Sequence, residues 1–144
     1  MARRPRWLDF LADDPRPWLL EASDPAVRAA TLTRLLGKPG DDPDVVEART
    51  AAMSAAPIAG ILAAQDPEGF WEKPGPGYAP KYRGTVWNLI FLEQLGADPA
   101  DPGIQRACGY VLDWTATTAG GLGCSGGKHV PPPSSVLHCL NGNL

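Results

Sequence analysis

Apolar residues recur three or four positions apart along most of the chain, which is the spacing of one buried helix face. Several of these stretches begin at the Asp-Pro pairs Asp24-Pro25, Asp42-Pro43 and Asp101-Pro102. At such a pair the carboxylate accepts a free backbone N–H, and proline lacks the donor that would be unpaired there. Since no useful run alternates between apolar and polar residues, the sequence predicts an all-α fold.

Glycine and proline, 16 of each, mark where the predicted helices end. Helices are expected after Asp24-Pro25 up to Gly37, after Asp42-Pro43 up to Pro57, over Ile58–Ala64, over Tyr82–Leu95, after Asp101-Pro102 and over Leu137–Leu144. The apolar faces of these helices are expected to include Val27, Val46, Ile104, Ala107, Cys108, Val111 and Leu112, and the last face extends toward Trp114. Residues 72–81 and 120–133 are too rich in Gly and Pro for regular structure and are predicted to be loops.

The most informative segment is Gln65-x-x-x-Gly69-x-Trp71, which directly follows the Ile58–Ala64 stretch. The carboxamide of Gln65 can cap a helix end and also bond the backbone of a following helix pair. Trp71 offers a large apolar face and one N–H donor, and Gly69 permits the turn between them. These groups predict a joint that ties one helix pair to the next, with a stabilising role.

The order of features after this segment carries a resemblance to a known family. Residues 81–89 have the sequence KYRGTVWNL, and Leu92-x-x-Leu95-Gly96 follows. Together with Gln65, Gly69 and Trp71, this order resembles a repeat of the squalene cyclase and protein prenyltransferase (terpenoid cyclase) superfamily, with its QW motif. A second, degenerate copy aligns Val111 and Thr115 with Ile61 and Gln65 but lacks the Gln and the Trp.

The resemblance implies an incomplete α/α toroid of about six to eight helices. It also implies that residues 1–54 are a HEAT-like helical lead-in and that residues 55–144 are the cyclase-like repeats. A full toroid needs more helix pairs than 144 residues hold, which implies an N-terminal piece of a longer protein. The resemblance also implies an isoprenoid or other hydrophobic ligand. The truncated repeat end, where Leu140–Leu144 stops inside a predicted helix, is expected to support self-association.

A terpene cyclase of the protonating type needs an acidic motif, and this chain has no convincing one. The candidates are Asp13-Asp14, Asp41-Asp42 and the pair Asp98 and Asp101, and each precedes a proline or lies at a helix start. Helix capping and solvent exposure explain them better than catalysis. An enzyme acting on an isoprenoid, with its catalytic acid outside this chain, and a non-catalytic binding or scaffold module therefore both remain open.

Aromatic residues give the candidate ligand site. Tyr78, Tyr82, Trp87 and Trp114 either pack in the core or line a pocket that stabilises a cation by cation–π contact. Lys81 and Arg83 lie beside them, either as solvated residues or as partners of a diphosphate.

Two of the three cysteines and both histidines fall in one segment, at Cys124, His129, His138 and Cys139. Thiolate and imidazole are natural Zn²⁺ ligands, but the spacing matches no common zinc finger. Three interpretations stay open: an incidental cluster, a metal site completed by other residues, and a thiol nucleophile with a histidine base.

Charge and composition narrow the partners. Hydrophobic residues make up 44% of the chain, which is enough for a core, and the net charge of −3 gives no electrostatic case for nucleic acid. No apolar run approaches the roughly 18 residues of a transmembrane helix, and the basic start is not followed by a signal-type apolar region. An odd number of cysteines without a signal favours free thiols in the cytoplasm.

Overall fold

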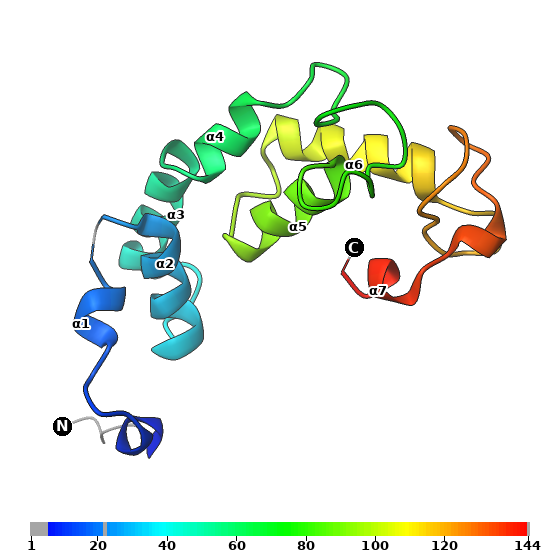
Figure 1. Ribbon diagram of the computed structural model, residues 1–144. Coiled ribbons are helices and arrows are strands. Elements are labelled where there is room, and N and C mark those ends of the chain that lie inside the picture. Colours follow the sequence, from blue (N-terminus) through cyan, green and yellow to red (C-terminus); the bar gives the residue numbers. More distant parts are fainter. Residues whose placement is uncertain (1–5, 22, 144) are drawn as a thin grey trace. The chain divides into compact units, whose positions relative to one another are not determined.

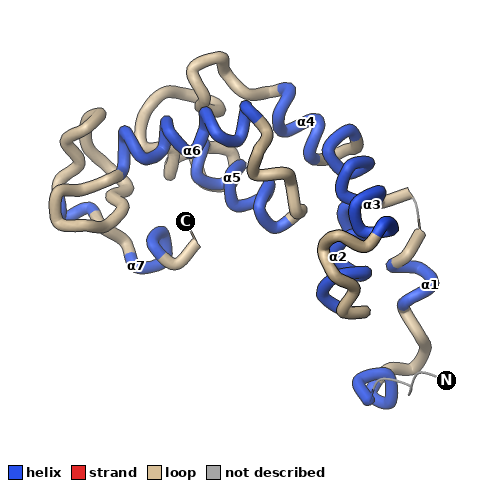
Figure 2. The backbone as a smooth tube through the Cα atoms, turned by 180° about the vertical axis from the view of Figure 1, so that it is seen from behind, coloured by secondary structure: helices blue, strands red, loops and turns tan. Residues whose placement is uncertain are grey.

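The computed structural model describes residues 6–21 and 23–143 (Figures 1 and 2). Its helical elements are η1 (Arg6–Phe10), α1 (Arg16–Leu19), α2 (Pro25–Ala30), η2 (Thr31–Leu35), α3 (Pro43–Ser54), α4 (Ile58–Ala63), α5 (Thr85–Gln94), α6 (Pro102–Thr115), η3 (Pro133–Ser135) and α7 (His138–Asn141). Within the described residues, β-structure is limited to isolated bridges between residues 116 and 136. The prediction of an all-α fold is confirmed.

The chain divides into two units, Met1–Ala52 and Met53–Leu144, and each is described by itself. The division lies within α3, whereas the sequence predicts a domain boundary after residue 54. The predicted lead-in also includes residues 1–5, which lie outside the described residues.

Carboxylates start the helices of the first unit as the sequence predicts. Asp24 Oδ1 accepts the backbone N–H of Val27 at 3.1 Å, directly before α2. Asp42 Oδ1 accepts the N–H of Asp44 at 3.0 Å, directly before α3, and also pairs with the ammonium of Lys38 at 3.0 Å. The π-helical turn η2 extends α2, and Gly37, at φ 69°, follows its end. Local capping chemistry therefore sets both helix starts in this unit.

The core of the first unit consists largely of small side chains. Its members are Ala29, Leu32, Val45 and Ala48, with Leu20 packed against them. Val27 and Val46, predicted to face the core, are 38% and 49% exposed. That part of the prediction is wrong because the buried stripe of each helix passes through alanines, which a pattern based on large apolar residues does not mark.

In the second unit, α5 packs against both α4 and α6. Figures 1 and 2 show α5 and α6 side by side. Val86 of α5, Val111 of α6 and Leu140 of α7 form one buried cluster, which places the short C-terminal helix against the pair. The core of this unit therefore joins three helices, although residues 116–137 separate α7 from α6 along the chain.

Helix α5 begins at Thr85, later than the predicted start at Tyr82. Tyr82 has a positive φ of 67°, and Gly84 lies in extended conformation directly before the helix. The backbone at Gly84 passes so close to the carbonyl of Gly77 that a Cβ would collide with it, and Val86 N–H bonds that carbonyl at 3.2 Å. The contact with the preceding loop therefore sets the helix start.

Helix α6 buries Ile104, Ala107 and Val111 as predicted, but Cys108 and Leu112 are exposed. Tyr110 occupies the buried side instead. The buried face of α6 differs from the predicted one because Tyr110 contacts the loop before α5. Tyrosine is only weakly apolar, so the hydrophobic pattern did not mark it. Helix α7 covers only His138–Asn141 of the predicted Leu137–Leu144, and Leu144 lies outside the described residues.

Among the described residues, one helical stretch, Pro43–Ala63, is long and apolar enough to cross a membrane by length and composition. A single stretch of this kind is weak evidence, and here it is interrupted between Ser54 and Ile58. The described part of the chain thus holds no strong transmembrane helix.

Candidate functional site

The Gln65 side chain links the end of α4 to the start of α6. Its Nε2 donates to the carbonyl of Gly103 at 2.9 Å, and Arg106 Nη2 donates to its Oε1 at 2.9 Å. The bond to the backbone of the following helix pair, expected for this residue, is present. Because both ends of one carboxamide are used on α6, Gln65 fixes the distance between the two helices.

Trp71 closes the same joint from the other side. Its indole is buried, and Nε1 donates to the carbonyl of Ile61 at 2.7 Å. Its backbone N–H donates to Oγ1 of the fully buried Thr85 at 3.2 Å. Trp71 therefore connects α4 to the first residue of α5, while satisfying its own buried donor.

Gly69 is required where the turn passes α6. Its φ of 101° is unusual for any residue with a side chain, and a Cβ there would lie 2.9 Å from Cγ and 3.0 Å from the carbonyl oxygen of Arg106. We call Gln65, Gly69 and Trp71 the joint. It has the geometry of a helix-pair connector.

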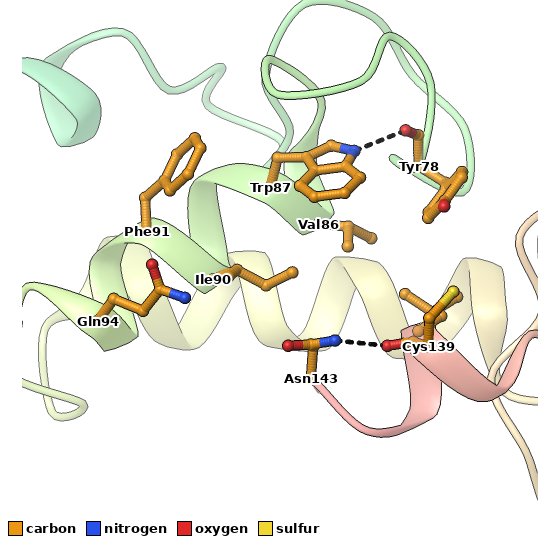
Figure 3. A pocket seen from close by; sticks show the side chains of 9 residues that line it. Tyr78, Val86, Trp87, Ile90, Phe91, Gln94, Cys139 and Asn143 are labelled. Atoms are coloured by element: carbon orange, nitrogen blue, oxygen red, sulfur yellow. Dashed lines mark hydrogen bonds between the residues drawn. The ribbon is translucent and has the colours of Figure 1, made fainter.

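A pocket of about 190 Å³ lies along α5, beside α7 (Figure 3). Its wall combines aromatic and aliphatic side chains with a few uncharged polar groups. The lining residues are Tyr78, Val86, Trp87, Ile90, Phe91, Gln94, Cys139, Leu140 and Asn143.

Two of the four predicted aromatic residues meet at this pocket. The rings of Tyr78 and Trp87 lie 5.6 Å apart, and Trp87 Nε1 donates to the carbonyl of Tyr78 at 2.8 Å (Figure 3). Tyr82 contacts Trp87 edge to face at 5.0 Å but is not part of the lining. Lys81 Nζ lies 4.9 Å from the Tyr82 ring centroid and 5.8 Å from that of Trp87. Its contact with Tyr82 is the main cause that raises the pKa of Lys81.

Trp114 lies elsewhere. It stacks on Tyr110 with ring centroids 6.0 Å apart, and Tyr110 in turn contacts Phe70 at 5.5 Å. The indole Nε1 of Trp114 is buried without a hydrogen-bond partner in the described residues. The structure thus separates Trp114 from the pocket because α6 presents it beside Tyr110. Arg83, the second predicted diphosphate partner, pairs with Glu72 at 3.5 Å.

The four Cys and His residues do not come together. Within the described residues, no three His, Cys, Asp or Glu side chains are placed to hold one metal ion. Cys124 packs against the core cluster, Cys139 lines the pocket, and His129 and His138 are exposed. His129 lies 3.9 Å from Asp113, across the turn that its backbone N–H closes on the Asp113 carbonyl. The arrangement offers neither a metal site nor a paired thiol and imidazole.

The candidate acids serve as caps and surface ion pairs. Asp101 Oδ1 accepts the N–H groups of Gly103 and Ile104 at the start of α6, and Asp98 accepts that of Ala100. Asp14 pairs with Arg16 at 2.6 Å. Every Asp and Glu in the described residues is exposed or half-buried, and none lines the pocket. The described chain therefore offers no buried carboxylic acid that could protonate an apolar substrate.

Sequence reasoning did not identify Phe91, Gln94, Asn143 or Cys139 as pocket residues. The spacing of Trp87, Phe91 and Gln94 at i, i+4 and i+7 marks one helix face, which is the signal available for the α5 side. Asn141 fixes the α7 side: it accepts from Leu122 N–H at 2.8 Å and donates to the Leu122 carbonyl at 3.0 Å. No local sequence pattern predicts the hydrogen bonds between Asn141 and Leu122.

Comparison with protein-family models finds no match, and neither curated proteins nor solved structures yield a significant one. The pocket and the joint are therefore the features of the described chain that bear on function.

Proposed function

We propose that residues 53–144 form a non-catalytic repeat module of the squalene cyclase and prenyltransferase type, which binds the end of an isoprenoid or similar branched apolar molecule in the α5–α7 pocket. The observation that carries this proposal is the pocket itself, where Tyr78, Trp87 and Phe91 surround an apolar space without any carboxylate among the lining residues.

Three further features support the proposal. The joint links successive helices through Gln65 and Trp71, as a repeat architecture requires. Aromatic and aliphatic side chains dominate the pocket wall, as they do in sites for apolar ligands. The volume of about 190 Å³ lies below the roughly 300–1,000 Å³ usual for whole drug-sized ligands, so the pocket suits one end of a chain.

Cys139 makes the proposal directly testable, because this exposed thiol lines the pocket while the equally free Cys108 lies on α6 outside it. The full chain is treated with a thiol-alkylating reagent with and without myrcene, geraniol or geranyl diphosphate, and each cysteine is followed by mass spectrometry. We expect at least one of these ligands to slow modification of Cys139 and to leave Cys108 unchanged. Absence of protection and of any thermal shift with all three would refute the binding proposal.

The non-catalytic part has its own test. Incubation of the chain with geranyl diphosphate or squalene, followed by gas chromatography of the extract, is expected to return the substrate unchanged. The reason is that the described acids are committed to capping or lie in solvent. A cyclised product that depends on the folded chain would show that the module is an enzyme.

A further inference from the structure

The walls of the pocket differ in polarity from one end to the other. Trp87, Phe91 and Gln94 lie on one face of α5, and the seven positions from first to last span about 10 Å at the rise of a helix. In Figure 3, the rings of Trp87 and Tyr78 lie together, while the Gln94 carboxamide lies at the opposite end of the same helix. Tyr78 and Trp87 therefore form one end, and the other end presents, beside Phe91, a carboxamide that both donates and accepts.

The carboxamide of Gln94 is available for a ligand. It makes no side-chain hydrogen bond within the described residues, unlike Gln65, which uses both of its ends. Asn143 donates through Nδ2 to the carbonyl of Cys139 at 2.6 Å, which leaves its Oδ1 as an acceptor on the pocket wall. These two amides are groups suited to a hydroxyl or an amide on the ligand.

The charge around this end disfavours an anion. None of the lining residues is charged. Gln94 is the last residue of α5, where the helix dipole places partial negative charge, and Glu93 precedes it. The cation Lys81 lies at the aromatic end, over the rings of Tyr82 and Trp87. A phosphate or carboxylate head beside Gln94 would therefore meet the negative end of the helix dipole, and none of the described lining residues supplies a cation.

Resting on the proposed binding function, we infer that the pocket takes an amphiphile without an anionic head, with a hydroxyl or amide head hydrogen-bonded to Gln94 and a branched apolar tail directed toward Tyr78 and Trp87. The ligand class is thus an isoprenoid alcohol, or a molecule of the same polarity, and not a prenyl diphosphate.

Three molecules with related carbon skeletons separate the possibilities: geraniol, myrcene and geranyl diphosphate. Their dissociation constants for the full chain are measured by Cys139 protection and by calorimetry. We expect geraniol to bind more tightly than the other two. Gln94→Leu should weaken geraniol about 3- to 10-fold, the usual effect of one solvent-accessible hydrogen bond, and leave myrcene unchanged. Glu93→Leu, an exposed neighbour outside the lining, is the matched control and should leave both ligands unchanged.

The outcomes distinguish this inference from the function on which it rests. Tighter binding of the diphosphate than of geraniol would overturn the exclusion of an anionic head while preserving the binding function. Equal loss of geraniol and myrcene in Gln94→Leu would overturn the hydrogen bond to Gln94. If none of the three binds, the proposed function itself fails.

Discussion

The side-chain hydrogen bonds within the two units differ in the sequence separation of the residues that they join. In the first unit, Arg28 donates to the Leu20 carbonyl eight positions away, and Lys38 pairs with Asp42 four positions away. In the second unit, Gln65 reaches Gly103 across 38 positions. The side-chain hydrogen bonds described in the first unit are thus local, whereas those of the second include bonds between distant segments.

This difference matters for the pocket because one residue of its aromatic wall, Tyr78, belongs to a loop. Tyr78 lies in the Gly- and Pro-rich segment between Trp71 and Thr85, which has no regular structure of its own. That loop is fixed by the Trp71 N–H bond to Thr85 and by the Gly75 N–H bond to the Tyr110 hydroxyl at 2.8 Å. Substitutions at the joint should therefore disturb the pocket without touching it.

The largest effect is expected from Trp71→Ala. Loss of a buried tryptophan costs about 3–5 kcal/mol, and here it also removes the donor to the Ile61 carbonyl. Chemical denaturation should show the loss, and hydrogen exchange should place it in residues 53–143. The control is Trp18→Ala in the first unit, whose side chain is 69% exposed and whose removal should change stability by less than about 0.5 kcal/mol. Equal effects from the two tryptophans would contradict the comparison.

A smaller effect is expected from Gly69→Ala. The residue has φ 101°, and its new methyl group would meet the Arg106 backbone at 3.0 Å, so we expect a loss of about 1–3 kcal/mol. Gly60→Ala, on α4 with nothing within 4 Å, is the matched substitution and should be neutral or stabilise by about 0.5–1 kcal/mol. Denaturant midpoints of both variants test the pair. If Gly69→Ala proved harmless, the turn could not depend on the close passage of α6.

Gln65→Leu should follow, with a loss of about 1–2 kcal/mol, because it breaks the bonds to the Gly103 carbonyl and to Arg106 at a half-buried position. The matched control is Gln105→Leu, which removes a bond to the Pro99 carbonyl only six positions away at an exposed site. We expect Gln65→Leu to reduce the protection of Cys139 from alkylation by a bound ligand. Gln105→Leu should leave this protection unchanged. Indistinguishable behaviour of the two glutamines would mean that the long-range bond does not position the pocket.

Local signals predicted the features that depend on neighbours. The Asp-Pro pairs predicted the caps at Asp24 and Asp101, since a carboxylate next to a free N–H acts within three residues. The bond from Gln65 to the next helix pair was also predictable, because the motif carries its own donor and acceptor. The buried stripes through alanine, and the exposed Val27 and Val46, were not predictable, since the size of a side chain does not reveal how closely two helices approach.

The pocket could not be predicted from local sequence patterns, for a related reason. Its second wall is α7, held by the burial of Leu140 against Val86 and Val111 and by the Asn141 bond to Leu122. Those contacts join segments on opposite sides of a loop, which no periodicity encodes. Tyr78 and Trp87 could be nominated because aromatic residues are conspicuous, whereas Gln94 is an ordinary polar residue on a helix until α7 is placed.

The smallest effect is expected in the first unit, from Asp42→Asn, and it should depend on pH. The Lys38 ammonium, then the N–H of Asp44, hold the pKa of Asp42 below its ordinary value of 3.8. A lowered pKa means that the carboxylate stabilises the fold above the unfolded-state value, and that this contribution is lost as pH falls through the folded-state value. Asparagine still accepts the capping N–H, so the variant loses only the ion pair.

Urea unfolding at pH 7 and at pH 3 tests this, with hydrogen exchange of residues 38–52 as the local readout. Asp42→Asn should be slightly less stable than the parent chain at pH 7, and the difference should shrink at pH 3. Asp24→Asn, a cap for which asparagine substitutes well, should differ little from the parent at either pH. A loss of the same size at both pH values would contradict a stabilising ion pair between Lys38 and the ionised Asp42. If the pH-dependent loss of protection from hydrogen exchange is confined to residues 38–52, the effect of the substitution in the first unit is local. This would contrast with the joint, where substitution of Gln65 is expected to change ligand protection of Cys139.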